Sequence, residues 1–290
     1  MKKKLSVVLI VMLAMALCFA MSACNNQDAA DQGNTDTPVV EGNTVIRLST
    51  TTSVNDSGLL PYLQPAFEAA TGYTLEITSA GTGAAIEKGR TGDADALLVH
   101  AKASEEEFIA EGYATERVPF MYNFFVIAGP ADDPAGIKDC ATAAEAFAKI
   151  AESGIKFISR GDDSGTHKAE LKIWDAAGIN PDPAVDSWYI SAGAGMGACI
   201  TMAEEEQAYV LTDKATFLTN AKDLTILLEQ ADDMKNTYSM LIVSADKWPD
   251  NNIAGAQAFV EWMQSDEAKA MINAYGVEEY GQQLFYTIDE

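Results

Sequence analysis

The chain has 290 residues, 48% of them hydrophobic, and a formal net charge of -24 at pH 7. A chain this acidic excludes nucleic acid as a partner and disfavours docking by charge to an anionic surface. Any anionic ligand would have to be held by local, desolvated donors, which is feasible because salt screens the general negative field over about 8 Å.

Residues 1–24 have the features of an export signal. Three lysines precede an apolar run over 5–20, and the segment 21–24 (MSAC) resembles a lipoprotein cleavage box, in which Cys24 would become the acylated N-terminus. A transmembrane anchor is the alternative, but the apolar run is short and polar residues follow the cysteine at once. Both interpretations place the rest of the chain outside the cytoplasmic membrane, and we expect a lipid anchor.

Residues 25–43 are polar and acidic and contain few large apolar side chains. Such a segment cannot bury enough surface to fold, so we interpret it as a tether. The folded part would begin at residue 44, and its length suits one large domain or two small ones.

Cysteine and histidine are scarce in the part that would fold. Cys140 and Cys199 could pair in a disulfide, as exported cysteines often do, or could equally be small buried thiols. With His100 and His167 as the only histidines, a zinc or iron site is not expected, and no calcium-loop motif occurs. We therefore expect no metal ion and no cofactor.

Strands and helices alternate through the first part of this region. We expect strands over 44–50, 73–78 and 96–100, and helices over 59–70, 81–90 and 104–112. Asp56 or Ser57 would cap the first helix, and Gly72 would end it. This alternation predicts a parallel sheet with right-handed crossovers.

A long strand over 118–129 leads into a second α/β region. We expect further strands over 155–159, 187–191, 207–211, 224–228 and 237–244, and helices over 141–151, 168–178, 193–206, 212–220, 253–263 and 268–275. Two α/β units bridged by one outgoing and one returning long strand indicate two lobes around a hinge, as in binding proteins that enclose a ligand. The first lobe would comprise 44–122 and 238–290, and the second 123–237.

The segment Arg160 to His167 (RGDDSGTH) lies where a short strand meets a helix. Such a junction presents free backbone N–H groups and a partial positive charge. Ser164 and Thr166 add hydroxyl donors, and Gly165 lets the backbone come close. The guanidinium of Arg160 matches a tetrahedral oxyanion. An ordinary helix cap beside a surface ion pair is the simpler interpretation, but these residues exceed what a cap needs, and we favour an anion site.

Ligands in α/β sheets bind beyond the carboxyl ends of the strands. Besides the Arg160 loop, three expected loops at such ends are rich in hydroxyl groups or glycine, over 50–53, 79–83 and 193–197. Each could be ordinary turn chemistry. Four such loops at the same sheet edge favour a binding site.

Many segments in chain order resemble the tungstate-binding lipoproteins of ABC importers (TupA type). They are TTTS (50–53), DSGLL (56–60), GTG (81–83), GDADALLVHA (92–101), MYN (121–123), DDPAG (132–136), RGDDSGTH (160–167), GAGMG (193–197) and LTD (211–213). The resemblance implies a type II periplasmic-binding-protein fold, with two parallel-sheet lobes joined by a two-strand hinge. It also implies a monomer that captures tungstate, with tungsten held only as the oxyanion, and delivers it to a membrane permease with an ATPase.

The motif Arg-x-Asp-x-Ser-Gly-Thr is also similar to that of phosphate-binding proteins. This similarity implies four anion contacts, Arg160, Ser164, Gly165 and Thr166, with Asp162 as the partner that orients Arg160. His100 aligns near the carboxylate that accepts the phosphate proton in those proteins; it would instead suit a fully deprotonated dianion, or it simply caps its strand. The other loops complete the predicted set with Thr51, Thr52, Ser53, Thr82, Gly83, Gly195 and Met196.

The leading hypothesis is therefore an oxyanion receptor that prefers tungstate, with molybdate, sulfate or phosphate as alternatives. The family resemblance carries the choice of tungstate, because tungstate and molybdate are nearly the same size. A secreted serine hydrolase using Ser164 and His167 is the alternative from another class, but no G-x-S-x-G elbow surrounds Ser164. A surface adhesin would not need hinge strands and converging polar loops. We expect a binding protein and no enzyme.

Overall fold

The structure is a computed structural model that describes residues 42–288. The predicted signal peptide over 1–24, its lipidation at Cys24 and all but the last two residues of the predicted tether over 25–43 lie outside the described residues. Within 42–288, no helix is both long and apolar enough to span a bilayer.

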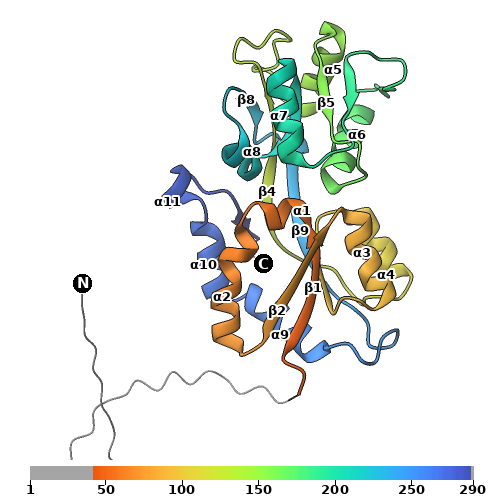
Figure 1. The fold of residues 1–290 in the computed structure, drawn as a ribbon, viewed down its shortest axis with the longest axis vertical. Coiled ribbons are helices and arrows are strands. Elements are labelled where there is room, and N and C mark those ends of the chain that lie inside the picture. The colour runs from red at the N-terminus through yellow and green to blue at the C-terminus, as the bar shows by residue number, and fades with distance from the viewer. Residues whose placement is uncertain (1–41, 289–290) are drawn as a thin grey trace, which may run out of the picture. The chain divides into compact units, whose positions relative to one another are not determined.

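The first lobe is built on a sheet with the strand order β2-β1-β3-β9-β4, and β10 pairs with β4 as well (Figure 1). Its strands are β1 (Val45–Thr51), β2 (Thr74–Ala80), β3 (Ala96–Val99), β4 (Val118–Gly129), β9 (Lys235–Ile242) and β10 (Tyr286–Thr287). The pairs of β1 with β2 and of β1 with β3 are parallel, while β9 runs antiparallel to β3. The loops after the three parallel strands therefore leave the sheet at one edge.

Helices cover both faces of this sheet. They are α1 (Thr52–Asp56), α2 (Leu59–Thr71), α3 (Thr82–Thr91), α4 (Lys102–Ala110), α9 (Ile253–Met263), α10 (Asp266–Ala274) and α11 (Val277–Tyr280). One apolar cluster lies between the sheet and α2, α9 and α10, and a smaller one lies beneath α3 and α4. These clusters fix the sheet edge from which the loops at 52, 81 and 100 emerge.

The second lobe has the sheet order β8-β4-β7-β5-β6. Its own elements are α5 (Ala143–Ser153), β5 (Phe157–Ser159), α6 (Gly165–Ala176), β6 (Tyr189–Ser191), α7 (Met196–Glu206), β7 (Tyr209–Asp213), α8 (Lys214–Asn220), β8 (Thr225–Glu229) and the short 3₁₀ helix η1 (Asp232–Met234). An apolar cluster under α5 and α6 and another under α7 and α8 cover its two faces.

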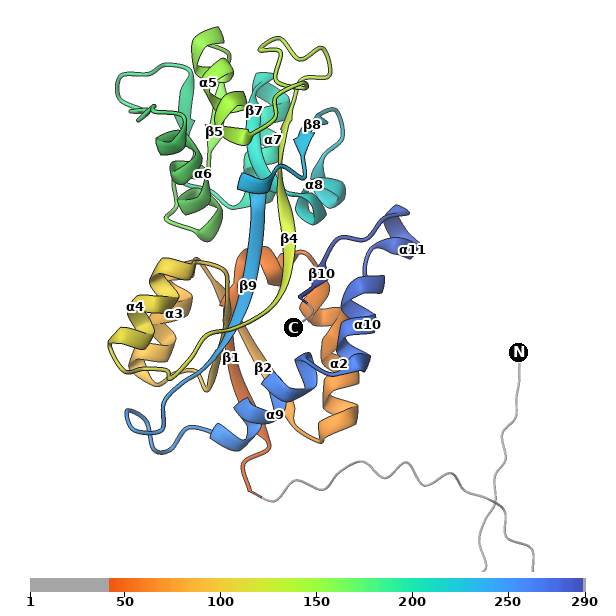
Figure 2. The same ribbon diagram turned by 180° about the vertical axis from the view of Figure 1, so that it is seen from behind.

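Two long strands join the lobes, and they pair with each other (Figure 2). Strand β4 is antiparallel to β9 from Val118 to Phe124 and then continues into the second sheet, where it lies between β7 and β8. The predicted two-lobed periplasmic-binding-protein fold is confirmed. The exact division into 44–122 with 238–290 and 123–237 stays a prediction.

The two lobes were expected to have parallel sheets, and each sheet is in fact mixed, because the hinge strands pair antiparallel with their neighbours. Strands β7 and β8 are each antiparallel to β4, which separates them, so the segment expected to close a second parallel unit pairs with the hinge strand instead. The reason is geometric: a strand that crosses from the first lobe enters the second sheet in the opposite direction to the strands formed there.

Several helix boundaries also differ from the predicted ones. Gly58, with φ of +82°, is the N-cap of α2, so the predicted cap at Asp56 or Ser57 is wrong; those residues end the short α1, which has no apolar periodicity to reveal it. The helix predicted from 168 begins at Gly165, because the Ser164 hydroxyl caps it. Both described cysteines, Cys140 and Cys199, are free thiols.

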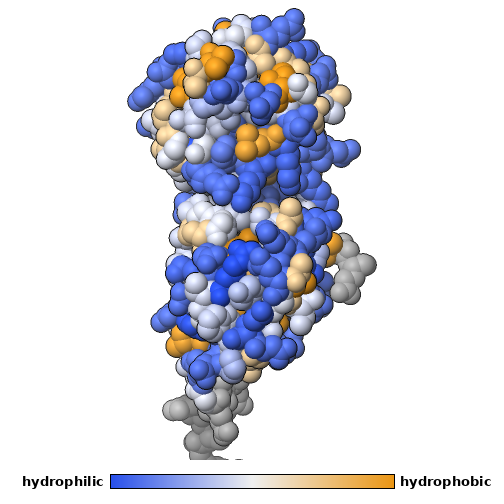
Figure 3. All heavy atoms as spheres, turned by 90° about the vertical axis from the view of Figure 1, so that its right-hand side faces the viewer, coloured by the Kyte–Doolittle hydropathy of each residue, from blue (hydrophilic) through white to orange (hydrophobic). Residues whose placement is uncertain are grey.

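Figure 3 shows the side of the molecule that carries α3, α4 and α6. Hydrophilic residues cover most of this face, and apolar residues lie on it in small, separate groups. Nothing on this face has the appearance of a broad apolar interface.

Candidate functional site

Loops from the two lobes meet at the predicted sheet edges. His100, which follows β3 in the first lobe, lies directly against Gly165 at the start of α6 in the second: a Cβ atom on Gly165 would lie 2.4 Å from His100 Cε1. A Cβ on Gly83, in the first turn of α3, would lie 3.7 Å from the Asp163 carboxylate. The structure thus brings the predicted residues around 82, 100 and 165 to one place.

Arg160 follows β5 and is buried, with an exposed fraction of only 4%. Its Nη2 donates to Oδ2 of Asp162 at 2.5 Å, and the backbone N–H of Ser164 donates to the other carboxylate oxygen. Burial alone would raise the pKa of Asp162, but the hydrogen bonds from Ser164 and the Arg160 charge outweigh it and lower that pKa. The Nε–H of Arg160 is buried and has no partner among the described residues.

The first turn of α6 presents further free donors. The Ser164 hydroxyl oxygen accepts the backbone N–H of His167, and the hydroxyl also contributes to the lowered pKa of Asp162. The backbone N–H groups of Gly165 and Thr166 have no hydrogen-bond partner in the described part of the chain, as is usual for a first helical turn. The buried hydroxyl of Thr166 also has none. Guanidinium, hydroxyls and N–H groups together can surround a tetrahedral anion.

The first lobe contributes hydroxyl groups from two loops. Thr82, the first residue of α3, is fully buried, and its hydroxyl finds no partner within residues 42–288. Thr51 ends β1, and its hydroxyl lies 3.2 Å from that of Ser53, which in turn lies 3.0 Å from Nε2 of His100. Thr51 and Ser53 therefore belong to the same buried polar group as His100.

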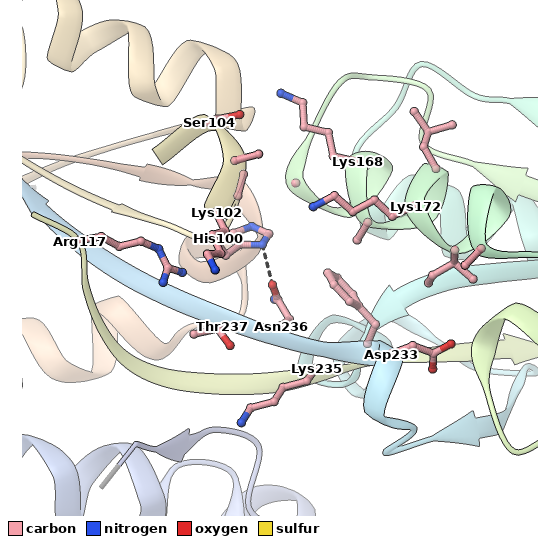
Figure 4. A pocket seen from close by; sticks show the side chains of 18 residues that line it. His100, Lys102, Ser104, Arg117, Lys168, Lys172, Asp233, Lys235, Asn236 and Thr237 are labelled. Carbon is pink, nitrogen blue, oxygen red and sulfur yellow. Dashed lines mark hydrogen bonds between the residues drawn. The ribbon is translucent and has the colours of Figure 1, made fainter. Parts of the chain in front are cut away.

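Both ring nitrogens of His100 are hydrogen-bonded. Its Nδ1 lies 2.8 Å from Oδ1 of Asn236 on β9, the bond drawn as a dashed line in Figure 4. Burial lowers the pKa of His100 to about 4, although the bond to Asn236 opposes this shift; the charge of Arg160 lowers the pKa further. His100 is consequently neutral at pH 7 in this structure, so only one of its two ring nitrogens carries a proton.

The remaining predicted residues lie on the other side of Ser53. A cavity of about 230 Å³ is lined there by Thr52, Ser53, Asp56, Met196, Gly197, Thr216, Thr219 and Asn220. The Met196 sulfur accepts a backbone N–H from Asp213, and Gly195 is the N-cap of α7. Met196 has no side-chain donor, so it and Gly195 could meet an anion only through backbone N–H groups.

A larger cavity, of about 710 Å³, is lined by His100 and Gly165 (Figure 4). Five basic residues line it, namely Lys102, Arg117, Lys168, Lys172 and Lys235. Asp233 lines it too, and three of the cations are ion-paired, Arg117 with Glu105, Lys102 with Glu106 and Lys168 with Asp163. Lys172 forms no ion pair with any described residue. In a chain of net charge -24, this is a local concentration of positive charge beside the predicted anion site.

Sequence reasoning missed several polar residues of this region. Asn123 and Asn236 face each other across the two hinge strands, and Tyr238 lies with its ring centroid 4.9 Å from that of His100. Buried Asp213 caps α8 through Thr216, and burial raises its pKa. A lone asparagine within an otherwise apolar strand, as at Asn123, was the available signal.

Comparison with known proteins agrees with this geometry. Residues 30–267 match the PBP superfamily domain. The chain is 43% identical over 289 residues to the tungstate-binding protein TupA of Peptoclostridium acidaminophilum, and the match covers 98% of each chain. Among solved structures, it is similar to the tungstate-binding protein TupA of Desulfovibrio alaskensis G20, with 40% identity and a TM-score of 0.75 over 85% of this chain and 99% of that one.

A second similar structure is that of the tungstate ABC transporter from Geobacter sulfurreducens, with 41% identity and a TM-score of 0.73. That match covers 80% of this chain and 98% of the other. Sequence and fold thus point the same way, and the chain belongs to the PBP superfamily and, within it, to the family of the tungstate-binding proteins TupA.

Proposed function

We propose that this protein is an extracytoplasmic receptor for tungstate that delivers the anion to the permease and ATPase subunits of an ABC importer. The observation that carries the proposal is that three of the buried donors without a partner among the described residues lie in the predicted site loops: Arg160 Nε and the hydroxyls of Thr82 and Thr166. Leaving a buried donor unsatisfied costs about 1–3 kcal/mol, and four anion oxygens would satisfy several at once. The family of the chain supports tungstate as the anion.

In this proposal the second lobe holds the anion most strongly. Arg160 supplies the charge, with Asp162 holding its guanidinium in place. Ser164 and Thr166 donate through their hydroxyls, and Gly165 and Thr166 through their backbone N–H groups. Gly195 and Met196 would contribute backbone N–H groups at the start of α7.

The first lobe would close on the anion from the other side. Thr51, Thr52, Ser53 and Thr82 are its hydroxyl contacts to the anion, Gly83 its backbone donor, and His100 its contact with the second lobe. Because each lobe supplies donors to one anion, binding should favour the closed arrangement. Small-angle scattering should give a smaller radius of gyration with tungstate than without it.

Selectivity follows if every group that contacts the bound anion donates to it. Phosphate near neutral pH carries a proton that needs an acceptor, whereas tungstate carries none. The acidic groups of this region already have partners: Asp162 is bonded to Arg160, Asp163 to Lys168, Asp213 to Thr216 and Asp56 to Asn55. Tungstate and molybdate should therefore bind while phosphate does not, since a buried hydrogen-bonding mismatch is rejected more strongly than one of size.

The protein would act as a monomer held to the membrane by a lipid on Cys24, without any catalytic activity. A hydrolase built on Ser164 and His167 is disfavoured, because the Ser164 hydroxyl caps the His167 backbone and His167 Nδ1 accepts the backbone N–H of Asp163. Ser53, His100 and Asn236 are hydrogen-bonded in sequence, as are a nucleophile, its general base and the residue that orients the base in a hydrolase. Incubation with a panel of aryl esters and aryl phosphates should nevertheless give no turnover above that of a Ser53→Ala variant.

Calorimetric titration of the protein with tungstate, molybdate, sulfate and phosphate is the direct test. We expect tight binding of tungstate, binding of molybdate, and no competition by phosphate even at millimolar concentration. Tight binding of phosphate would contradict both the donor-only site and the choice of tungstate.

A further inference from the structure

A line of hydrogen-bonded side chains connects the hinge strands to the first-lobe hydroxyls. Asn123 on β4 accepts from Nδ2 of Asn236 on β9 at 2.9 Å, and the two residues are direct cross-strand neighbours. Oδ1 of Asn236 lies 2.8 Å from His100 Nδ1, and His100 Nε2 lies 3.0 Å from the Ser53 hydroxyl. Thr51 ends the line, 3.2 Å from Ser53.

Asn236 determines which atoms donate and which accept along this line of hydrogen bonds. Both hydrogens of its Nδ2 are used, one on Asn123 and one on the hydroxyl of Tyr238, so its Oδ1 faces His100 and accepts the Nδ1–H. Turning the amide over would leave one buried N–H of Asn236 unpaired, at a cost of about 1–3 kcal/mol. Neutral His100 therefore carries its proton on Nδ1, and Nε2 is an acceptor.

This direction has a consequence for the anion. The single hydroxyl proton of Ser53 is held by His100 Nε2, so Ser53 offers only lone pairs to a ligand, and lone pairs repel an oxyanion. If a proton is added at Nε2, the bond reverses: the imidazolium donates to the Ser53 oxygen, and the Ser53 proton is free to bond to the anion. The proton comes from solvent, and its charge offsets one charge of the dianion.

Charges around the ring decide when this happens. Arg160 is the cation whose charge bears on His100; Tyr238 packs against the ring, with Asp213 beyond it, and Lys102 and Lys235 line the adjoining cavity. Without an anion, Arg160 and burial disfavour the imidazolium. A dianion between Arg160 and His100 reverses the balance, since opposite charges within about 4–6 Å favour the charged form.

We propose that Asn123 and Asn236 are positioning residues that fix His100 so that anion binding is coupled to uptake of one proton at its Nε2, which converts Ser53 from an acceptor into a donor. The inference rests on the proposed function, because it concerns the same site. It adds a role for the hinge strands, which hold the amide pair that orients the ring.

Calorimetry of tungstate binding in pairs of buffers with different heats of ionisation measures the coupled protons directly. Between about pH 6.5 and 8, the unaltered protein should take up a proton, approaching one per anion at the lower end. Affinity for tungstate should rise by up to about tenfold for each unit by which the pH falls. His100→Gln, which cannot titrate, should abolish the uptake and the pH dependence. Uptake that persists in this variant would overturn the proposal.

The amide pair is tested by substitution with a matched control. Asn236→Ala should reduce both the uptake and the affinity, and Asn123→Ala should do so more weakly. Asn236→Asp restores the acceptor and should bring back a titrating His100 with a raised pKa, visible in the imidazole NMR signals. The control is Asn251→Ala, which removes another buried asparagine. Asn251 accepts a hydrogen bond from Arg47 outside the site, so this variant should change neither the proton uptake nor the affinity for tungstate.

The outcomes separate the two proposals. Tungstate binding without proton uptake overturns the coupling and leaves the receptor function standing. No tungstate binding at all overturns the receptor function and the coupling with it. Loss of uptake in His167→Gln would assign the proton to the other histidine and would also overturn the coupling.

Discussion

Replacing Arg160 with alanine should weaken tungstate binding by at least about a hundredfold. Its guanidinium is buried at 4% exposure, and its Nε–H has no partner within residues 42–288, so in the proposed site it is committed to the ligand. Removing one member of a buried, charged hydrogen bond costs about 2–5 kcal/mol, and about 2.7 kcal/mol corresponds to a hundredfold change in Kd.

The loss would also expose the anion to Asp162. In the intact protein this carboxylate lies 2.5 Å from Arg160 Nη2, and its charge is compensated. Without Arg160, two negative charges about 4 Å apart would repel each other by about 4 kcal/mol at the effective dielectric typical near protein surfaces. The double variant Arg160→Ala with Asp162→Ala should therefore bind more tightly than Arg160→Ala alone.

Arg160→Lys separates charge from geometry. It keeps the positive charge and loses the planar fork, so its affinity should fall between those of the unaltered protein and Arg160→Ala. Calorimetry would give the affinities, and circular dichroism with a thermal melt would check that each variant is folded. A change under about threefold for folded Arg160→Ala would remove Arg160 from the site and refute the reasoning.

Four further outcomes are expected. Gly165→Ala should weaken tungstate binding in calorimetry, because its Cβ would lie 2.4 Å from the His100 ring; normal affinity would mean that the ring can move aside at little cost. Thr82→Val should cost about 1.5–3 kcal/mol of binding free energy, and an unchanged Kd would place the anion away from α3. Lys172→Glu should slow association in stopped-flow measurements at low salt by roughly threefold, with no such effect from Lys138→Glu on an exposed loop; equal rates would show that the basic cavity does not steer the anion. In the free protein, the His100 pKa is lowered to about 4, so on acidification the unfolded chain binds a proton at this residue before the folded protein does. The free energy of unfolding should therefore fall as pH drops from about 6.5 towards 4. Urea unfolding should show a loss of about 1–2 kcal/mol at pH 5, and the loss should be smaller in His100→Gln.

Local sequence patterns were sufficient for most of the secondary structure. The strand over 118–129 and the helix over 253–263 have the predicted bounds, because both are rich in apolar residues and the first is interrupted only at Asn123. The position of Gly72 and Gly154 at helix ends, both with positive φ, shows how a single residue can stop a helix. Strand direction was beyond such patterns, since β8 is antiparallel to β4 only because of the path the chain takes between the lobes.

The residues of the candidate site were also predictable only in part. The Arg160 loop could be predicted because its donors are adjacent in sequence and share one helix terminus. The asparagine pair could not, because Asn123 and Asn236 are 113 positions apart and meet only through the register of two hinge strands. The sequence identified Ser53 as a hydroxyl near the site, but only its bond to His100 shows that its proton is already engaged.

An acidic protein can hold a dianion because the local environment of the site differs from the protein as a whole. The buried donors around Arg160 act at hydrogen-bond distance, whereas the surplus of carboxylates acts mainly over distances at which salt screens it. The negative field still opposes approach, which gives the basic residues of the larger cavity a role that binding strength alone would not require. If the buried donors hold the anion and the basic residues of the cavity guide its approach, repulsion should dominate in Lys172→Glu. Raising the ionic strength should then speed association more in this variant than in the unaltered protein. Equal salt responses would place the route of entry elsewhere.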